Sequence, residues 1–317
     1  MTPLVTVYIP AYKAEETLEK AVNSALSQMD NLEVIIVDDC SPDGTFAVAQ
    51  KLAEKDARVR VFRLEQNSGA PCAMNYAFKQ AHGQWLALLD ADDWYEAGRL
   101  ENMLAEAIAQ NVEMVADNQY FFDKHANQVV GTAFPQKGRK QVVDLDVFLA
   151  NSNATKRFDY GMLKPMFRAD FIKEHAIEYY TPTYIGYDYC ILLCFFAAGG
   201  RAVLIDTPYY SYVQPFGSLS KKPQQEGRKH YNHVMQKDVN LHFIEALHGK
   251  ITQSQMAQLQ RRGREIDALI CFYELKEAVQ KKAIKTIFKI LTKTNLEFWK
   301  MMFRKVLNRM RCGVTGN

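Results

Sequence analysis

The stretch that decides the fold is residues 86–93, Leu86-Ala87-Leu88-Leu89-Asp90-Ala91-Asp92-Asp93. Its apolar half is typical of a strand buried on both faces, as in a parallel sheet covered by helices. Residues i and i+2 of an extended segment point the same way, so we expect Asp90 and Asp92 to face one hard cation, which prefers oxygen ligands. A solvated turn that caps the next helix is the alternative that these residues alone leave open.

Working outward, short β-branched runs alternate with helical stretches up to about residue 117. We predict strands at Val5–Ile9, Val34–Val37, Val59–Phe62 and Trp85–Leu89, and helices at Glu15–Gln28, Thr45–Glu54, Ala70–His82 and Ala97–Gln110. This alternation predicts an α/β fold with a mostly parallel sheet flanked by helices, whose ligands bind beyond the carboxyl ends of the strands.

The later part of the chain divides in two. Residues 118–217 mix strand patterns (118–122, 202–205, 209–213) with helical ones (169–175, 187–198), and we interpret them as the second half of the same fold. Residues 218–317 are predicted to be a helical C-terminal extension, broken near Gly249 and at 292–295. Thr294 and Glu297 have the spacing of a capping box, which predicts a last helix from Asn295.

Composition and charge exclude several classes of protein. The 317 residues are 48% hydrophobic and 24% charged, which excludes disordered and disulfide-scaffold chains. The net charge of +3 argues against a nucleic-acid binder. Residues 276–311, however, hold eleven Lys and Arg against two acids, so this tail carries +9 while the rest, with 28 basic and 34 acidic residues, carries −6.

The cellular location is predicted from two features of the sequence: its longest apolar run and the residues before its first strand pattern. The longest uncharged apolar run, 189–200, is shorter than the roughly 20 residues that span a bilayer. No basic region precedes the first strand pattern, so we expect no signal peptide and a cytoplasmic protein. The six cysteines form no CxxC pair, which favours reduced core residues.

Four ordered motifs resemble those of family 2 glycosyltransferases with the GT-A fold. They are Val5-Thr-Val-Tyr-Ile-Pro-Ala-Tyr12, Val34-Ile-Ile-Val-Asp-Asp-Cys-Ser-Pro-Asp-Gly-Thr45, Asn67-Ser-Gly-Ala-Pro-Cys-Ala-Met-Asn75 and Leu88-Leu-Asp-Ala-Asp-Asp93. The similarity continues through residues 166–175, 185–188 and 209–214. Residues 1–117 would then be the nucleotide-sugar-binding half of the domain, and residues 118–217 the acceptor-binding, catalytic half.

The resemblance implies a role for particular residues. Asp188 matches the general base that acts on the acceptor hydroxyl, and Asp92 matches the carboxylate that holds Mn²⁺ or Mg²⁺ on the donor diphosphate. The residues that match the nucleotide-binding positions are Pro10, Ala11, Tyr12, Asp39, Asn67 and Asp90. Tyr12 would lie against uracil, Asp39 would accept its N3–H, and Asp90 would lie near the ribose or the sugar.

The implied function is inverting transfer from a nucleotide-sugar, with UDP as the expected nucleotide. The acceptor would be a saccharide on a polyprenyl-diphosphate carrier, in the synthesis of bacterial exopolysaccharide, capsule or O-antigen. A haloacid-dehalogenase-type phosphatase is less consistent, because its Asp-x-Asp lies near the N-terminus. A nucleotidyltransferase would need a Gly-rich, Arg-containing loop where this chain has Pro10-Ala11-Tyr12-Lys13.

Three departures from the family pattern keep another hypothesis open. Met74 stands where the family has Arg, Tyr187 where it has an acid, and Val213 where it has Arg. Lys221 and Lys222 are our candidates to replace the missing phosphate contacts, although a lysine pair is also common in solvated loops. The alternative function is a catalytically degenerate transferase that serves as a membrane-associated assembly subunit.

The C-terminal tail combines lysines with an apolar stripe at helical spacing, which runs through Ile284, Ile287, Phe288, Leu291, Leu296, Trp299, Phe303, Val306 and Met310. A basic amphipathic helix with Trp and Phe binds anionic membrane surfaces, here the inner face of the cell membrane. The alternative is that the stripe packs on the protein's own core while the lysine stems cover it.

Overall fold

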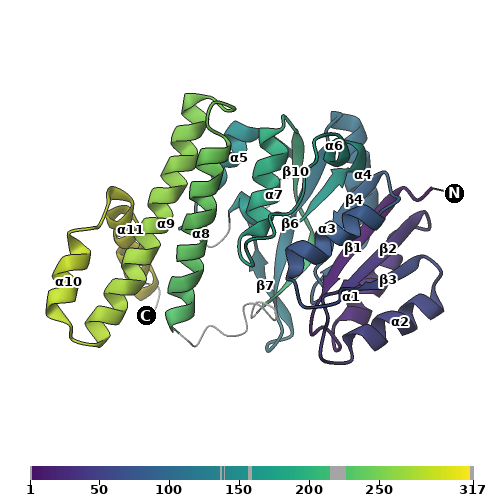
Figure 1. The fold of residues 1–317 in the computed structure, drawn as a ribbon, viewed down its shortest axis with the longest axis horizontal. Helices are drawn as coiled ribbons and strands as arrows, with labels where there is room; N and C mark the ends of the chain where they lie inside the picture. Colours follow the sequence, from purple (N-terminus) through teal and green to yellow (C-terminus); the bar gives the residue numbers. More distant parts are fainter. Residues whose placement is uncertain (1, 136–137, 139, 156–158, 215–225, 315–317) are drawn as a thin grey trace. The chain divides into compact units, whose positions relative to one another are not determined.

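The computed structural model describes residues 2–135, 138, 140–155, 159–214 and 226–314, with side chains left out for 226–231 and 306–314. One half of its sheet consists of four parallel strands in the order β3-β2-β1-β4: β1 (Val5–Ala11), β2 (Leu32–Asp38), β3 (Val59–Arg63) and β4 (Trp85–Leu88). Every residue of β2 and β4 is buried, which explains their continuous apolar runs. The four predicted strands are confirmed (Figure 1).

A short antiparallel strand continues the sheet. β9 (Pro165–Arg168) pairs with β4 on one side and with β6 (Met114–Asp123) on the other. β10 (Ala202–Gln214) then lies parallel to β6. It joins the two strands that the sequence predicted separately, with an irregular register around Pro208.

β9 was not predicted, and neither were three further strands. β5 (Trp94–Tyr95) and β8 (Lys140–Val143) pair antiparallel with β10, and β7 (Gln128–Thr132) pairs antiparallel with β6. They are short or solvent-exposed, so they lack the buried apolar pattern by which strands are recognised.

Helices flank the sheet: α1 (Leu18–Leu26), α2 (Thr45–Lys55), α3 (Ala70–Gln80), α4 (Arg99–Gln110), α6 (Ala169–Glu174) and α7 (Tyr187–Ala197), with a 3₁₀ turn at Tyr160–Met162. The apolar side of α1, with Leu18 and Val22, packs in one core with Val7 and Val34 of the strands. α7 is buried on nearly all sides, which fixes the helix that carries Asp188. The predicted α/β architecture is confirmed.

The structure divides into two compact units. The first contains Met1–Phe148 and Tyr160–Lys222, and the second contains Leu149–Asp159 and Pro223–Asn317. The chain passes from one to the other within α5 (Leu145–Asn151). The predicted boundary at 217/218 lies outside the described residues.

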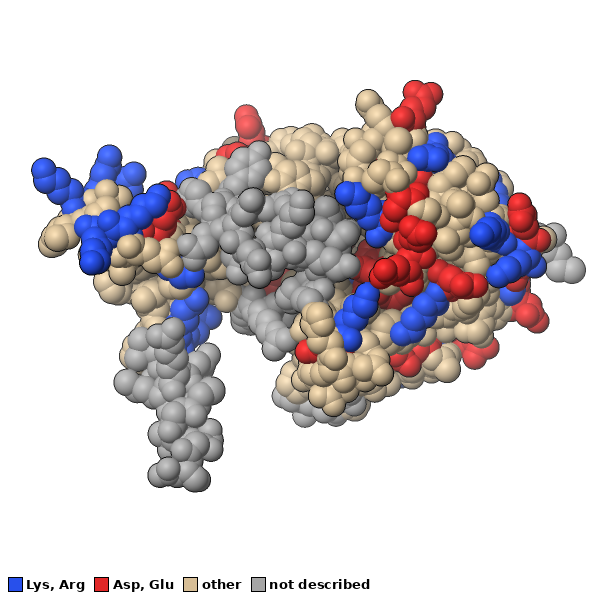
Figure 2. Space-filling view, turned by 90° about the horizontal axis from the view of Figure 1, so that it is seen from below, with Lys and Arg blue, Asp and Glu red and all other residues tan. Residues whose placement is uncertain are grey.

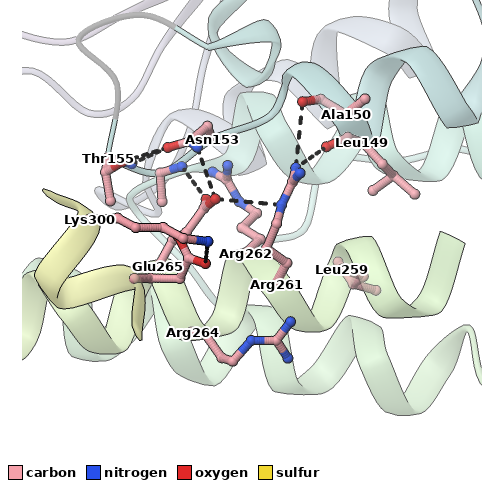
Figure 3. Close-up of polar contacts among 12 residues, drawn as sticks. Leu149, Ala150, Asn153, Thr155, Leu259, Arg261, Arg262, Arg264, Glu265 and Lys300 are labelled. Atoms are coloured by element: carbon pink, nitrogen blue, oxygen red, sulfur yellow. Dashed lines mark hydrogen bonds and ion pairs between the residues drawn. The ribbon is translucent and has the colours of Figure 1, made fainter. Parts of the chain in front are cut away.

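The second unit is helical, as expected: α8 (Glu226–Ala246), α9 (Gln253–Gln280), α10 (Ile284–Leu291) and α11 (Leu296–Val314). α8, α10 and α11 each pack on α9. Residues 149–155 are fixed to α9 by polar contacts, chief among them those of the buried Glu265 (Figure 3). The expected breaks near 249 and at 292–295 are present, and a further one separates α9 from α10.

The helix-capping prediction was wrong at the last helix. Asn295, not Thr294, caps α11: its Oδ1 accepts from the N–H of Phe298 at 3.0 Å. The Thr294 hydroxyl instead donates to the carbonyl of Leu291, because Asn and Ser/Thr compete for the same backbone groups at a helix end. The capping box is at α9, between Thr252 and Gln255, where it was not predicted.

Two expectations can be compared with the described residues: that the cysteines are reduced, and that no helix is long and apolar enough to cross a membrane. Cys40, Cys72, Cys190, Cys194 and Cys271 are free thiols. Among the described helices, none has the length and apolar character needed to cross a membrane.

Candidate active site

The ends of β1 and β2 meet around Asp39, which is almost fully buried. Its carboxylate accepts the N–H of Ser68 at 2.7 Å on Oδ1 and that of Gly69 at 2.8 Å on Oδ2. Asn67 donates its side-chain amide to the Asp39 carbonyl at 3.1 Å. Burial raises the pKa of Asp39, although the two N–H groups oppose this. Asp39 therefore ties the loop of the third motif to the sheet edge.

The first-motif residues lie beside this loop. Pro10 and Ala11 end β1, and the Asp39 N–H donates to the Ala11 carbonyl at 2.9 Å. Tyr12 follows directly and is half-buried, with the Lys13 ammonium 5.2 Å from its ring centroid. The structure thus brings four predicted nucleotide-binding residues of β1 and β2 and the loop residue Asn67 to one sheet edge.

The segment after β4 is a turn rather than an extended strand. The Asp93 N–H donates to the Asp90 carbonyl at 3.1 Å, so the chain reverses at Ala91 and Asp92. The expectation that Asp90 and Asp92 project alike from an extended segment was wrong, because this hydrogen bond closes a four-residue turn.

Asp93 is structural. Its carboxylate accepts the Tyr210 hydroxyl at 2.8 Å and the Val213 N–H at 2.8 Å, and the same hydroxyl accepts the N–H of Asp90 at 3.1 Å. Burial, together with the charges of Asp92 and Asp90, raises the pKa of Asp93 well above its usual range. Asp93 therefore fastens the acidic turn to β10 and leaves Asp90 and Asp92 as the acids of the site.

Lys164 joins two of the predicted residues. Its ammonium lies 2.7 Å from Asp90 Oδ2 and 3.1 Å from Asp188 Oδ2. Lys164 directly precedes β9, and because β9 runs antiparallel to β4, its amino end lies at the carboxyl end of β4. Lys164 could not be predicted from its position after a strand, because it precedes a strand instead.

Asp188 lies in the first turn of α7, after Gly186, which has a positive φ of 74°. Its Oδ1 is buried and accepts no hydrogen bond from the described residues. Burial raises the pKa of Asp188, whereas the neighbouring Lys164 lowers it.

The segment before α7 is fixed by hydrogen bonds to the side chain of Asn75. Asn75 exchanges two hydrogen bonds with the backbone of Tyr179, at 2.9 and 2.8 Å. The hydroxyls of Tyr179 and Tyr8 lie 2.8 Å apart, which ties this segment to β1. The last residue of the third motif thus has a structural task.

The positions that depart from the family pattern hold no charge. Met74 is fully buried, and the Val213 backbone serves Asp93. Lys221 and Lys222, the proposed replacements, lie outside the described residues. Lys164 is therefore the described lysine that lies among the acids of the site (Figure 2 shows the charges on one face).

The donor set fits a divalent cation held mainly by a substrate. No three His, Cys, Asp or Glu side chains of the described residues form a closed metal site. Asp92, with Asp90 two residues away, offers the one or two carboxylates by which proteins hold a cation that takes its other ligands from phosphates and water.

Comparisons with known proteins agree with this geometry. Residues 6–187 match the model of Glycosyl transferase family 2, and the chain belongs to that family. The succinoglycan biosynthesis protein ExoO of Rhizobium meliloti is 31% identical over 221 residues, which are 69% of this chain and 63% of that protein. The matched part thus spans less than two thirds of ExoO. The Escherichia coli UDP-Glc:alpha-D-GlcNAc-diphosphoundecaprenol beta-1,3-glucosyltransferase WfgD is 34% identical over 137 residues, 42% of this chain and 52% of that protein.

Solved glycosyltransferases share the fold. The S. aureus TarS 1-349 complex with UDP-GlcNAc has a TM-score of 0.57 at 20% identity, covering 90% of both chains. The mannosyltransferase PcManGT from Pyrobaculum calidifontis, in complex with GDP-Man and Mn²⁺, has a TM-score of 0.59 at 18% identity, covering 98% of this chain and 81% of that one. The predicted GT-A fold is thereby confirmed.

Proposed function

We propose that this protein is an inverting glycosyltransferase that moves a sugar from a UDP-sugar to a lipid-linked saccharide in the synthesis of a bacterial surface polysaccharide. The observation that carries the proposal is that the Lys164 ammonium is ion-paired with both Asp90 and Asp188. It brings an acid of the donor-side turn next to Asp188, whose Oδ1 is buried and accepts no hydrogen bond from the residues that the structure describes.

The donor nucleotide would bind at the edge formed by β1, β2 and the third motif. Each oxygen of Asp39 accepts one backbone N–H and has a second lone pair for the N3–H of uracil. Tyr12 would stack on the base, while Pro10, Ala11, Asn67 and Asp90 line the ribose side. Bound Mn²⁺ or Mg²⁺, held by Asp92, would neutralise charge on the diphosphate.

In the proposed transfer step, Oδ1 of Asp188 acts as the general base. Asp188 Oδ1 would accept the proton of the acceptor hydroxyl while that oxygen forms a bond to the anomeric carbon. The bond from this carbon to the diphosphate oxygen breaks, and the nucleoside diphosphate leaves with the electron pair. Attack opposite to the leaving group inverts the anomeric configuration.

The division of labour along the chain remains our proposal: residues 1–117 bind the donor and residues 118–217 the acceptor. A lipid-linked acceptor is supported by the name of WfgD, a relative whose acceptor is a diphosphoundecaprenol-linked sugar.

A thermal-shift screen of UDP-, GDP- and dTDP-sugars, with and without Mn²⁺, followed by a transfer assay, tests the function. We expect stabilisation by a UDP-sugar that needs Mn²⁺, and release of UDP on turnover. The Asp92→Ala variant should lose the Mn²⁺-dependent part of the stabilisation. Binding without turnover of any donor by the wild-type chain would instead favour the degenerate, assembly-subunit function.

We also propose that the C-terminal helices attach the protein to an anionic membrane surface. Ile290, Phe298 and Met301 are buried, the last two against Ala268 of α9, and they fix α10 and α11 within their own unit. Other apolar side chains of these helices remain exposed, with Phe288 and Leu296 both at 67%: the set is Ile284, Phe288, Leu296, Trp299 and Phe303.

Charge favours a lipid surface as the partner of this face. The exposed lysines Lys282, Lys285, Lys289, Lys293 and Lys300 lie on the same two helices and the turns next to them. Figure 2 shows basic side chains gathered on the part of the helical unit where α10 lies. Aromatic side chains beside lysines bind anionic lipid headgroups through both burial and charge, each lysine contributing about 1 kcal/mol.

Liposome co-sedimentation tests the membrane proposal. Phe288→Ser/Trp299→Ser and, separately, Lys285→Glu/Lys289→Glu should reduce binding to phosphatidylglycerol vesicles at least tenfold, while phosphatidylcholine vesicles bind little of any variant. Ile108→Ser, which removes an apolar side chain that is 78% exposed on α4, is the matched control and should bind like the wild type. Unchanged binding of both double variants, or a change in oligomeric state instead, would contradict the proposal.

A further inference from the structure

We propose that Lys164 is the positioning residue of the site: it holds one oxygen of Asp188 and one of Asp90, and so leaves the other oxygen of Asp188 free for the acceptor's proton. This inference rests on the proposed function. Neither the sequence motifs nor the family resemblance pointed to Lys164.

The geometry assigns the two oxygens of Asp188 different tasks. Oδ2 accepts from the Lys164 ammonium at 3.1 Å, whereas Oδ1 is buried without a partner among the described residues. A buried acceptor without a hydrogen bond costs free energy, about 1–3 kcal/mol, and is rare in folded proteins unless a ligand uses it. An ammonium donates at single points, so it can occupy one oxygen and spare the other, whereas a guanidinium tends to take both.

The burial of Lys164 requires this arrangement. Its side chain is only 6% exposed, and a buried ammonium is stable only when carboxylates compensate it. Asp90 and Asp188 provide two, and each would repel the other if the ammonium were absent. The lysine therefore lies between the two carboxylates and is ion-paired with each of them.

The backbone of Lys164 is itself fixed. Arg99 donates from Nη2 to the Lys164 carbonyl at 2.8 Å, and its guanidinium is paired with Asp117 at 2.7 Å. Arg99 and Asp117 are both fully buried. The next residue, Pro165, begins β9 between β4 and β6. The lysine stem thus starts from a rigid point, as a side chain that positions a catalytic group requires.

Several groups act on the charge of Asp188: Lys164, Asp90, Tyr8, Tyr179 and Tyr187. The tyrosines are buried and neutral, and Asp90 raises the pKa of Asp188, so the lysine is the group that opposes protonation of the base. Removal of the lysine charge should therefore move the acid limb of the kcat profile to higher pH.

The test compares Lys164→Met and Lys164→Arg with the wild type, using the UDP-sugar that the wild type turns over. Lys140→Met is the matched control. Lys140 lies on β8, outside the site, and is ion-paired with Glu106 of α4. At pH 7 we expect kcat to fall about 100-fold in the methionine variant, within the range attributed to a general base. Its acid limb should move up by at least one pH unit. The arginine variant should keep the acid limb near its original position because it keeps the charge, but its kcat should also fall at least tenfold, because a guanidinium tends to take both oxygens of Asp188.

Lys164→Gln carries the test if the methionine variant does not fold, because its amide still donates to the acids but has no charge. It must show the same alkaline shift. A methionine or glutamine variant with wild-type kcat, or with lower kcat and an unmoved acid limb, would overturn the proposal. Absence of turnover by the wild type with every donor would refute the proposed function instead, so the two failures are distinct.

Discussion

Two acids, one in each unit, show how a structural carboxylate differs from one that is available for chemistry. Glu265 of α9 uses both oxygens: Oε1 accepts from Asn153 at 2.9 Å and Oε2 accepts the N–H of Ala154 at 3.0 Å (Figure 3). Asp188 of α7 uses only Oδ2, for Lys164, and its Oδ1 has no described partner. Burial raises the pKa of both acids.

The difference teaches that a raised pKa alone does not identify a functional acid, because burial produces it in both units. What distinguishes Asp188 is the unused acceptor. A fully bonded acid contributes to stability, whereas an acid with a free buried oxygen costs stability until a ligand donates to it.

The largest effect should come from Asp188→Asn. The amide cannot accept the acceptor's proton, so we expect kcat to fall about 10³-fold, while UDP affinity changes little. Transfer assays together with UDP titration calorimetry measure this. Retained turnover would mean that Asp188 is not the general base.

The next effect should come from the second unit, where Arg262 Nη1 pairs with Asp159 Oδ2 at 2.9 Å and both side chains are about nine-tenths buried. Arg262→Met removes one partner of a buried ion pair and should lower the free energy of unfolding by about 3 kcal/mol. Urea denaturation measures it, with the exposed Arg264→Met as the control, expected within 0.5 kcal/mol of the wild type by the usual effect of surface substitutions, roughly ±0.5. A loss of kcat per folded molecule would contradict a purely structural role.

The smallest effect should come from Glu265→Gln. At pH 7 the amide can satisfy only one of the two donors that face it, at a cost of about 1 kcal/mol. Because the folded-state pKa of Glu265 is raised, its carboxyl contributes most below its unfolded value of about 4.3, and this contribution is lost as the pH rises through the folded value. Urea midpoints at pH 4.5 and 8 should therefore show that the advantage of the wild type over the variant shrinks at high pH. A constant difference would mean that the pKa is not raised.

Much of the fold was predictable because buried strands carry their own pattern. The runs that became β1, β2 and β4 are largely apolar without alternation, since both of their faces are covered. β7 was not predictable, since four of its five residues are exposed and its position depends on pairing with β6. The last cap was mispredicted because Thr294 and Asn295 are both good caps, and only the packing of Phe298 decides which one serves.

The site was predictable only where residues follow parallel strands. Asp39 and Asn67 follow that rule, and the structure joins them by a hydrogen bond. Lys164 precedes a short apolar strand whose antiparallel direction no local pattern encodes. The turn after β4 was mispredicted as extended because the bond from Asp93 to Asp90 depends on Tyr210 and Val213, more than 100 residues away.

The insertion of β9 between β4 and β6 also has a consequence for synthesis of the chain. Until residue 168 has left the ribosome, β4 has a neighbour on one side only, and the backbone groups on its other edge are open. About 80 residues separate β4 from β9 in the sequence. Strands so far apart pair late, because the entropy cost of closing the loop comes before the contacts form. The nascent chain therefore exposes an apolar strand edge next to the motif on which donor binding depends, and we expect chaperones to be needed at that stage more than at any later one.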